Sequence, residues 1–380
     1  MRIHLKYVTS SCSTPRFRIR LNRTQLNSNT YPNVKAQLMN LSKIVLTAAL
    51  VIGSTLSVSA NAKTAEKHPG MDALALAAAD GDKELAERFN TLLEKGVYQK
   101  SIIDAITRPA EAKPWKAYRP IFMTSERISE GVKFWQTHAA LLTAVQARYE
   151  VPAEYIVAII GVETFYGRNV GKYKVLDALT TLGLYYPPRQ PFFSGELKQL
   201  LKFSEQTKYK VDPLSAVGSY AGAMGMGQFM PSSTANFAVD GDEDGQVDMW
   251  NSKADVFASI ANYFIGHGWE PGGPVLRVAS VQRNARAIKE PGLLPVFPVS
   301  QLRDWGYHLR SGVKPAPADD RLANLVVLEA ENGPQTMMVF QNFYTITRYN
   351  RSPLYATAVH QLAQAIGKQY RAASKPIAKP

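Results

Sequence analysis

Residues 151–167 read VPAEYIVAIIGVETFYG, and the rest of the chain is organised around this stretch. It predicts a short, nearly all-apolar helix, because Pro152 suits a first helical position and Gly167 suits the residue just past a helix end. The helix has no obvious polar face. Its acid near the far end, Glu163, is therefore placed in the last helical turn.

The surroundings of Glu163 favour its protonated form. A carboxylate in the last turn faces the negative end of the helix dipole, and the apolar neighbours Ile159, Ile160, Phe165 and Tyr166 would desolvate it. An acid held partly protonated near neutral pH can protonate a leaving oxygen. The alternative is a surface residue on a half-buried helix, which the lack of a polar face argues against.

A glycine-rich segment, GSYAGAMGMGQFMPSS, follows at residues 218–233. It is not a dinucleotide fingerprint, because the order is G-x-x-G-x-G and no strand leads into it. A plain turn is the simplest interpretation. Ser219 and Gln228 favour a binding loop instead, since they can address hydroxyls and amides within a flexible lining of Met224, Met226 and Met230.

Residues 240–248, DGDEDGQVD, match the first half of a calcium-loop template, with acids at positions 1, 3 and 5 and glycine at 6. The twelfth position is Asn251 instead of glutamate, so Asp255 would have to supply the missing ligand through a longer loop. Asp255 also has the spacing of a capping box with Ser252. We favour a metal, because clustered acids repel one another without a cation, and calcium over magnesium.

The first 62 residues are predicted to be a leader. Residues 39–62 combine a short basic start, an apolar run and a small-x-small cleavage pattern ending at Ala62, so Met39 could be the true start. The apolar run is short for a membrane anchor. The only cysteine, Cys12, falls in the part that cleavage would remove, and no cysteine near the cleavage site could accept lipid. These features predict a soluble exported protein.

The formal net charge of +13 gives a misleading picture of the mature protein. Residues 1–62 hold eight Lys or Arg and no acid, which leaves 36 basic against 31 acidic residues, a net charge of +5, in the remainder. No polybasic run is present. Nucleic acid is therefore not expected as a partner.

The other segments predict a mainly α, α+β protein with a small β-rich insertion. Before the central helix we expect helices at 71–95, 97–106 and 125–150, and an extended aromatic segment at 113–120, because two prolines argue against a helix there. After it we expect a helix beginning at Asp177, a proline-broken loop at 185–191 and a helix capped by Ser194. Strands are predicted at 275–281 and 322–331, a final helix from Pro353, and a disordered tail.

Several of these motifs together resemble one family. IIGVETFYGRN, FFSGEL, GSYAGAMGMGQFMPSS, the acidic loop, ANYFIGHGW and NFYTITRYNRS occur in the order of the lytic murein transglycosylases of the membrane-bound B type, including their soluble form. The resemblance runs from about Tyr118 to the C-terminus. It implies a lysozyme-like α-rich catalytic core at 151–271, with a helical domain at 63–150, a β-rich region at 272–338 and a groove-completing segment at 339–370. The residues themselves predict the leader at 1–62 and a disordered tail at 371–380.

The resemblance implies that the substrate is the glycan strand of peptidoglycan and that Glu163 is the single catalytic acid and base. Glu163 would protonate the oxygen between N-acetylmuramic acid and N-acetylglucosamine, then accept a proton from the muramyl O6 hydroxyl as it attacks C1, giving a 1,6-anhydro end. Ser219 would position the substrate's N-acetyl group. Two alternatives remain open: a muramidase that admits water, and a non-catalytic wall-binding or calcium-binding scaffold.

The resemblance also implies a set of binding residues. Sequence pattern alone favours a solvated charge for Arg189, whereas the family motif places it in the groove, and Pro188 stands where the family often has another arginine. No cofactor is expected for the chemistry, and a structural Ca²⁺ or Na⁺ is. A periplasmic monomer of a Gram-negative bacterium, with other cell-wall enzymes as possible partners, is expected. The implied glycan-binding residues are Tyr118, Arg189, Ser219, Gln228, Tyr263, Tyr349, Asn350 and Tyr355, and the implied metal ligands are Asp240, Asp242, Asp244, Gln246 through its carbonyl, and Asp255.

Overall fold

The computed structural model describes residues 67–108, 113–288, 292–310 and 316–374. The predicted leader, with Met39, Ala62 and Cys12, lies outside these residues. Residues 63–380 belong to one unit, and residues 1–62 to another. Nothing in the structure tests the predicted domain boundaries, which stay predictions.

The central helix, α7 (Ala153–Thr164), is where the sequence predicts it, and nine of its twelve residues are buried. Pro152 is its N-cap, one position earlier than expected. The helix ends before Gly167, because Phe165 and Tyr166 already have left-handed backbones, with φ of 50° and 62°. The Tyr166 ring turns back over the helix, where a Cβ on Gly161 would lie 2.7 Å from its hydroxyl. Glycine at 161 makes room for this ring.

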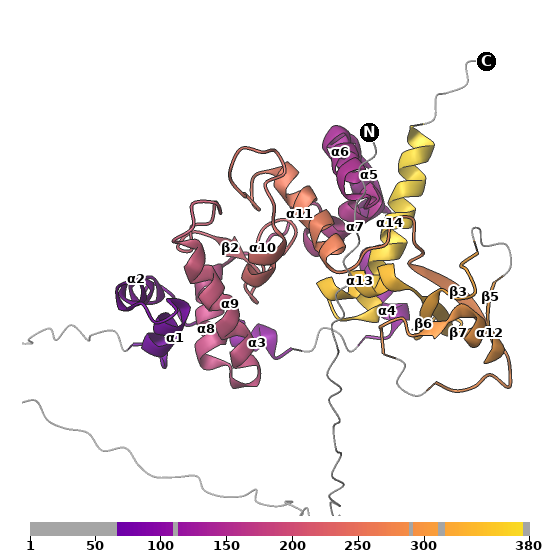
Figure 1. Cartoon of the computed structure of the whole chain (residues 1–380), viewed down its shortest axis with the longest axis horizontal. Coiled ribbons are helices and arrows are strands. Elements are labelled where there is room, and N and C mark those ends of the chain that lie inside the picture. Colours follow the sequence, from indigo (N-terminus) through magenta and orange to yellow (C-terminus); the bar gives the residue numbers. More distant parts are fainter. Residues whose placement is uncertain (1–66, 109–112, 289–291, 311–315, 375–380) are drawn as a thin grey trace, which may run out of the picture. The chain divides into compact units, whose positions relative to one another are not determined.

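Four helices surround α7 (Figure 1): α5 (Ser125–Thr137), α6 (Ala139–Tyr149), α11 (Lys253–Gly266) and α14 (Pro353–Ala373). The single helix predicted at 125–150 is therefore wrong, because the chain breaks at His138. The His138 ring packs edge-on against Phe134 at 4.7 Å and Phe257 at 5.6 Å. The break lets α5 pack on α14 while α6 packs on α11.

The first helices pack on a pair further along the chain. α8 (Val175–Tyr185) and α9 (Gln190–Phe203) lie side by side, α1 (Met71–Ala78) contacts α9, and α3 (Lys100–Ile106) contacts α8 (Figure 1). The helix predicted at 71–95 is in fact α1 and α2 (Lys83–Leu93). Asp80 and Gly81, which lie between these two helices, both have a positive φ. The Asp82 carboxylate caps α2 by accepting a hydrogen bond from the Leu85 N–H at 3.1 Å. Asp-Gly-Asp is a turn signal that the apolar periodicity hid.

The extended segment predicted at 113–120 is wrong as well, because α4 (Trp115–Phe122) is a helix that contains Pro120. Pro114 occupies its N-cap. Pro120 lacks the N–H that would bond the carbonyl of Lys116, but Lys116 is exposed, so water can satisfy that carbonyl. A helix of eight residues tolerates this single lost bond.

The segment predicted as a proline-broken loop holds a 3-10 turn, η1 (Pro187–Arg189), and α9 begins at once with Gln190. Ser194 does not cap α9. It lies inside the helix, and its hydroxyl donates to the Gly183 carbonyl of α8 at 2.7 Å. The residue thus joins two helices instead of starting one.

The predicted β-rich region is an antiparallel sheet in the order β4-β6-β7-β3-β5. Its strands are β3 (Leu276–Val281), β4 (Phe297–Pro298), β5 (Tyr307–Leu309), β6 (Leu322–Ala330) and β7 (Gly333–Val339), with α12 (Val299–Asp304) packed beside it. The predictions at 275–281 and 322–331 match β3 and β6. The two shortest strands were too short to give a pattern.

Two short strands and two helices complete the described part of the chain. They are β1 (Tyr173–Lys174) and β2 (Val217–Gly218), which pair with each other, α10 (Pro231–Phe237) and α13 (Gln341–Tyr349). Among the described residues, no helix has the length and apolar character needed to cross a bilayer. The helix α14 continues to Ala373, and residues 375–380, most of the predicted tail, lie outside the described part.

Candidate active site

Glu163 is the penultimate residue of α7 and is partly buried. Its Oε1 accepts a hydrogen bond from the hydroxyl of Tyr355, which lies on α14, at 2.5 Å. Tyr355 itself is only 3% exposed. The acid therefore sits where α7 ends against α14, as the two helices pack together.

Burial raises the pKa of Glu163 from 4.5 to about 7, and the hydrogen bond from Tyr355 acts in the opposite direction. The Tyr355 hydroxyl stays a donor, because burial, together with the nearby Glu163, raises its own pKa well above the usual range. Near neutral pH the Glu163 carboxyl is close to half protonated. It can therefore both give and accept a proton, as the sequence analysis anticipated.

The glycine-rich loop is tied to the end of α7. Met224 and Phe229 exchange two backbone hydrogen bonds, of 2.8 and 3.0 Å, and so close a tight turn between them. The Thr164 hydroxyl donates to the Met226 carbonyl at 3.0 Å, and the Tyr349 hydroxyl donates to the Gly227 carbonyl at 2.7 Å. Two neighbouring carbonyls of the loop are thus fixed, one of them by the residue that follows Glu163.

Gly225 shows why this loop needs glycine. Its φ is +64°, and a Cβ there would lie 2.3 Å from the Met249 carbonyl oxygen. Met224 and Met226 are buried in the core, so they hold the loop and do not form a flexible lining for a ligand. That part of the sequence interpretation is wrong.

Ser219 and Gln228 each have one polar group that forms no hydrogen bond with another described residue. The Ser219 oxygen accepts hydrogen bonds from the backbone N–H groups of Ala221, at 3.3 Å, and Ala223, at 3.0 Å. Its hydroxyl hydrogen can therefore be donated. The Gln228 amide nitrogen donates to the carbonyls of Val170, at 3.1 Å, and Gly225, at 2.9 Å, which leaves its oxygen as the acceptor.

The other predicted glycan-binding residues divide between buried and exposed positions. Tyr263 and Tyr349 are packed against each other at 4.9 Å, and Tyr263 donates to the Arg348 carbonyl at 2.7 Å. Tyr118 is buried on α4, and Asn350 is the C-cap of α13. Arg189 is exposed, with its guanidinium 4.6 Å from the Phe192 ring centre and 5.0 Å from that of Phe193. Their roles in binding glycan stay predictions.

Each fully buried acid in the described part of the chain already has a structural role. Asp177 accepts bonds from the Val97 N–H at 2.9 Å and the Gln99 side chain at 2.7 Å. Glu196, from the FFSGEL motif, accepts two bonds from Ser232 at the start of α10. The buried Asp248 and Asp255 accept bonds within the acidic loop. Glu163 is the partly buried acid that has a tyrosine donor and a raised pKa.

The acidic loop brings three of the predicted ligands together. Asp240, Asp242 and Asp244 can each place a carboxylate oxygen within 4.8 Å of the others. Hydrogen bonds from the backbone N–H groups of Gly245, Glu243 and Asp244 outweigh desolvation and lower the pKa of Asp240. These oxygen donors suit a hard cation such as Ca²⁺.

The other two predicted ligands are placed differently. The two Asp255 oxygens accept bonds from the N–H groups of Gly241 and Asp248, at 2.8 and 2.7 Å, so this side chain closes the loop across its base. Ser252 also caps α11 by accepting a bond from the Asp255 N–H at 3.2 Å. Gln246 is exposed, and its N–H donates to Asp244 at 2.8 Å. The donor set fits a cation, and the ligand assignment stays a prediction.

Sequence reasoning missed Thr164 and Arg127. A guanidinium nitrogen of Arg127 donates to the Gly161 carbonyl in the last turn of α7, and the guanidinium lies 4.5 Å from the Phe165 ring centre. The Tyr166 hydroxyl donates to the Arg127 carbonyl at 2.7 Å. These contacts fix the turn that follows Glu163. They join residues 34 to 62 positions apart, so no local pattern reveals them.

Comparison with known proteins gives the family. A sequence model of the transglycosylase SLT domain matches residues 68–364. The protein belongs to that family. A relative, the membrane-bound lytic murein transglycosylase B of Escherichia coli, is 42% identical over 253 residues, which cover 66% of this chain and 67% of the relative. The resemblance identified from the sequence motifs is confirmed.

Solved structures place this transglycosylase-family chain among lytic transglycosylases. Soluble lytic transglycosylase SltB1 from Pseudomonas aeruginosa is 42% identical, with a TM-score of 0.71, covering 79% of this chain and 99% of that one. Escherichia coli Slt35, in complex with calcium, is 36% identical, with a TM-score of 0.71 and coverage of 80% and 94%. Pseudomonas aeruginosa SltB3, in complex with NAG-NAM-pentapeptide, is 29% identical, with a TM-score of 0.67 and coverage of 81% and 82%. The predicted α-rich, lysozyme-like fold class is confirmed.

Proposed function

We propose that this protein cleaves the glycan strands of peptidoglycan without water, using Glu163 alone as acid and then as base. The proposal rests on the raised pKa of Glu163, which keeps a proton available near neutral pH, and on the structural roles of the other buried acids. A glycosidase with two catalytic carboxylates would need a second free acid across the bond. Membership of the transglycosylase family supports the same reaction class.

In the first step, protonated Glu163 gives its proton to the glycosidic oxygen as the bond from muramyl C1 to that oxygen breaks. In the second step, the Glu163 carboxylate takes the proton of the muramyl O6 hydroxyl as O6 bonds to C1. The acid ends in its starting state, and the product is a 1,6-anhydro sugar. The donated Ser219 hydroxyl hydrogen would hold the carbonyl oxygen of the substrate's N-acetyl group, whose participation replaces a second carboxylate.

Product analysis tests this reaction. Purified murein sacculi are digested with the wild-type protein and with Glu163→Gln, and the muropeptides are analysed by mass. We expect anhydromuramic ends, lighter by one water than reducing ends, and a loss of activity of roughly 10²- to 10⁴-fold in the variant. Substrate that carries an acetyl group on O6 should resist cleavage. Reducing muramic ends, or cleavage of O6-blocked strands, would instead identify a hydrolase.

We further propose that Asp240, Asp242 and Asp244 hold a structural Ca²⁺ together with the Gln246 carbonyl. The support is their mutual distance, their all-oxygen chemistry and the calcium complex of the related Slt35. Asp255 would bind the cation through carboxylate lone pairs that are not engaged in its two hydrogen bonds with backbone N–H groups. The cation would stabilise the loop before α11 and take no part in proton transfer.

We also propose that the protein acts in the periplasm, where its substrate lies. One relative is named as membrane-bound and another as soluble, so relatives of both kinds are known. The soluble form remains our prediction from residues 39–62. A monomeric state and contacts with other cell-wall enzymes stay predictions.

A further inference from the structure

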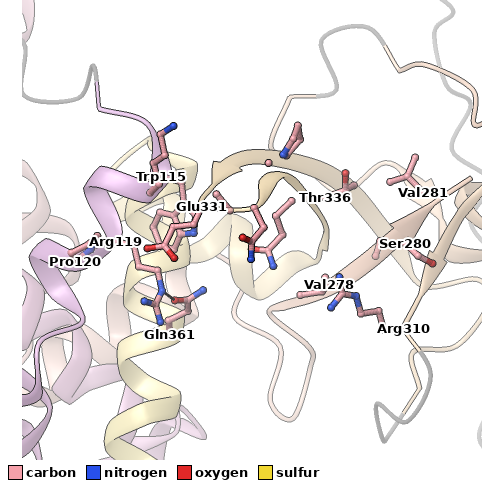
Figure 2. A pocket seen from close by; sticks show the side chains of 17 residues that line it. Trp115, Arg119, Pro120, Val278, Ser280, Val281, Arg310, Glu331, Thr336 and Gln361 are labelled. Carbon is pink, nitrogen blue, oxygen red and sulfur yellow. Dashed lines mark hydrogen bonds between the residues drawn. The ribbon is translucent and has the colours of Figure 1, made fainter. Parts of the chain in front are cut away.

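A cavity of about 690 Å³ between α4, α14 and the sheet is lined by neither Glu163 nor Tyr355. Trp115, Lys116 and Arg119 of α4 and Gln361 of α14 form one wall, and residues 278–281 and 333–336 form the other. Figure 2 shows Arg119, Gln361 and Glu331 on one side of this cavity and Arg310 beside Val278 on the other. The proposed cleavage reaction gives this cavity no role.

The sheet side of the cavity is a notch between two diverging strands. β3 pairs with β7 only from Leu276 to Val278, whose partner is Met337. From Ala279 to Val281, β3 pairs on its other edge with β5, and β7 continues to Gly333 paired with β6 alone. The next pair in register, Ala279 with Thr336, is not formed.

The alternation of an antiparallel ladder tells which backbone groups face this notch. Ala330 and Gly333 close a two-residue hairpin and form its first hydrogen-bonded pair, so every second residue of β7, counted from Gly333, bonds to β6. Thr336 lies between two such residues. Its backbone N–H and C=O therefore point away from β6, toward the notch. The Arg310 N–H donates to the Val278 carbonyl at 3.3 Å on the β5 side of β3, so Ala279 and Val281 turn their N–H and C=O toward β7. Two short free edges therefore face each other.

The side chains around the notch are mainly positive. Lys116, Arg119 and Arg310 are exposed, and no carboxylate within 4.0 Å pairs with any of them among the described residues; Glu331, in the β6–β7 hairpin, is the one acid of the lining. The Arg119 Nε donates to the Gln361 side chain at 2.7 Å, which holds the guanidinium in place. The notch thus offers extended backbone pairing and a net positive charge.

We propose that this notch binds the acidic peptide that peptidoglycan carries on its glycan strands. An extended peptide can bond to free strand edges, while cations recognise its carboxylates. The inference rests on the proposed function, because it takes that wall polymer as substrate, and it adds a second contact to the same polymer, away from the site of cleavage. Recognition of the peptide would favour strands that still carry their peptides over bare glycan.

The experiment measures peptide binding separately from cleavage. The probe is the free wall pentapeptide, fluorescently labelled at its amino end, and binding to the full-length protein is followed by anisotropy at low salt. A second probe is the same peptide with its carboxylates amidated. The variants are Lys116→Gln combined with Arg310→Gln, which lowers the positive charge of the notch, and Glu331→Gln, which raises it. Arg283→Gln combined with Lys368→Gln removes two exposed charges outside the cavity and serves as the matched control.

We expect Lys116→Gln with Arg310→Gln to weaken peptide binding roughly tenfold, the low end for charge-assisted hydrogen bonds at exposed positions. Glu331→Gln should tighten binding, the amidated peptide should bind more weakly, and the control pair should match wild type. On sacculi the Lys116/Arg310 variant should have a raised KM, with unchanged cleavage of peptide-free glycan.

Two outcomes overturn the inference: no peptide binding by the wild type, or equal binding by the Lys116/Arg310 variant and the control pair. Failure of the proposed function is seen separately. If the wild-type protein cleaves neither sacculi nor peptide-free glycan, the reaction assigned to Glu163 is wrong, while the anisotropy measurement still decides whether the notch binds the peptide.

Discussion

Replacing Glu163 by glutamine should make the protein more stable, and the gain should depend on pH. The folded-state pKa of this carboxyl is about 7, against 4.5 for a free glutamate, because the folded protein buries it. The folded state therefore holds its proton more tightly than the unfolded state does. Between these two pKa values the unfolded chain binds fewer protons, so stability falls as pH rises through this window.

The size of the effect follows from the two pKa values. At pH 8 the raised pKa lowers the free energy of unfolding by about 3 kcal/mol, and at pH 5 by less than about 1 kcal/mol. Glutamine carries no charge at either pH, and its side-chain oxygen can still accept the Tyr355 hydrogen bond. The stabilisation produced by Glu163→Gln should therefore be larger at pH 8 than at pH 5 by about 2 to 3 kcal/mol.

Chemical denaturation of wild type and variant at the two pH values measures this difference. Glu87→Gln is the matched control, because Glu87 is exposed on α2 and its carboxylate forms no hydrogen bond or ion pair with another described residue. That control should show the same small change at both pH values. A Glu163→Gln protein that gains nothing at pH 8, or gains equally at both, would refute the assignment of a buried, partly protonated acid at this position.

Three further results are expected. Tyr355→Phe removes the hydrogen bond that lowers the Glu163 pKa, so the alkaline limb of the profile of kcat/KM against pH should move to higher pH by about one unit. A limb that does not move would show that Tyr355 does not set the Glu163 pKa. Chelation of calcium should lower the melting temperature of the wild type. The Asp240→Asn variant should have a lower melting temperature before chelator is added, and chelator should not change it further. Equal decreases in both proteins would exclude this loop as the calcium site. Gly225→Ala should lower the free energy of unfolding by about 2 kcal/mol or more. Gly272→Ala should lower it clearly less, because Gly272 has a similar φ of 68° but lies in open space. Equal losses in chemical denaturation would show that the backbone shifts to remove the clash with the Met249 carbonyl.

The sequence predicted the centre of the fold well because its signals there are local. Pro152 and the apolar run of α7 fix where that helix begins and which residues it buries. The position of Glu163 at the end of this helix was enough to predict a desolvated acid, and its raised pKa agrees. The strands β3 and β6 were likewise predicted from their runs of apolar and β-branched residues, whereas β7, which begins Gly-Pro-Gln, was not.

Predictions failed where packing between distant segments overrides local pattern. His138 ends α5 in the middle of a run that reads as one helix, because its ring packs against Phe257 on α11. Pro120 argues against helix, yet α4 forms against α14. Ser194 is a residue type that often caps helices, but its hydroxyl donates to the carbonyl of Gly183, eleven residues earlier.

The candidate site shows the same limit at the level of single atoms. That Tyr355 binds glycan stays a prediction, and nothing in the sequence indicated that its hydroxyl donates to Glu163, 192 positions away in the chain. Burial alone would hold the Glu163 proton more tightly, and the Tyr355 donor stabilises the carboxylate that remains once the proton has left. An acid that must release a proton and then take one up requires these opposing influences to balance near the working pH. Because one influence comes from α7 and the other from α14, the packing of these two helices sets the balance, and substitutions in their interface should shift the pH dependence of cleavage even when they touch neither side chain.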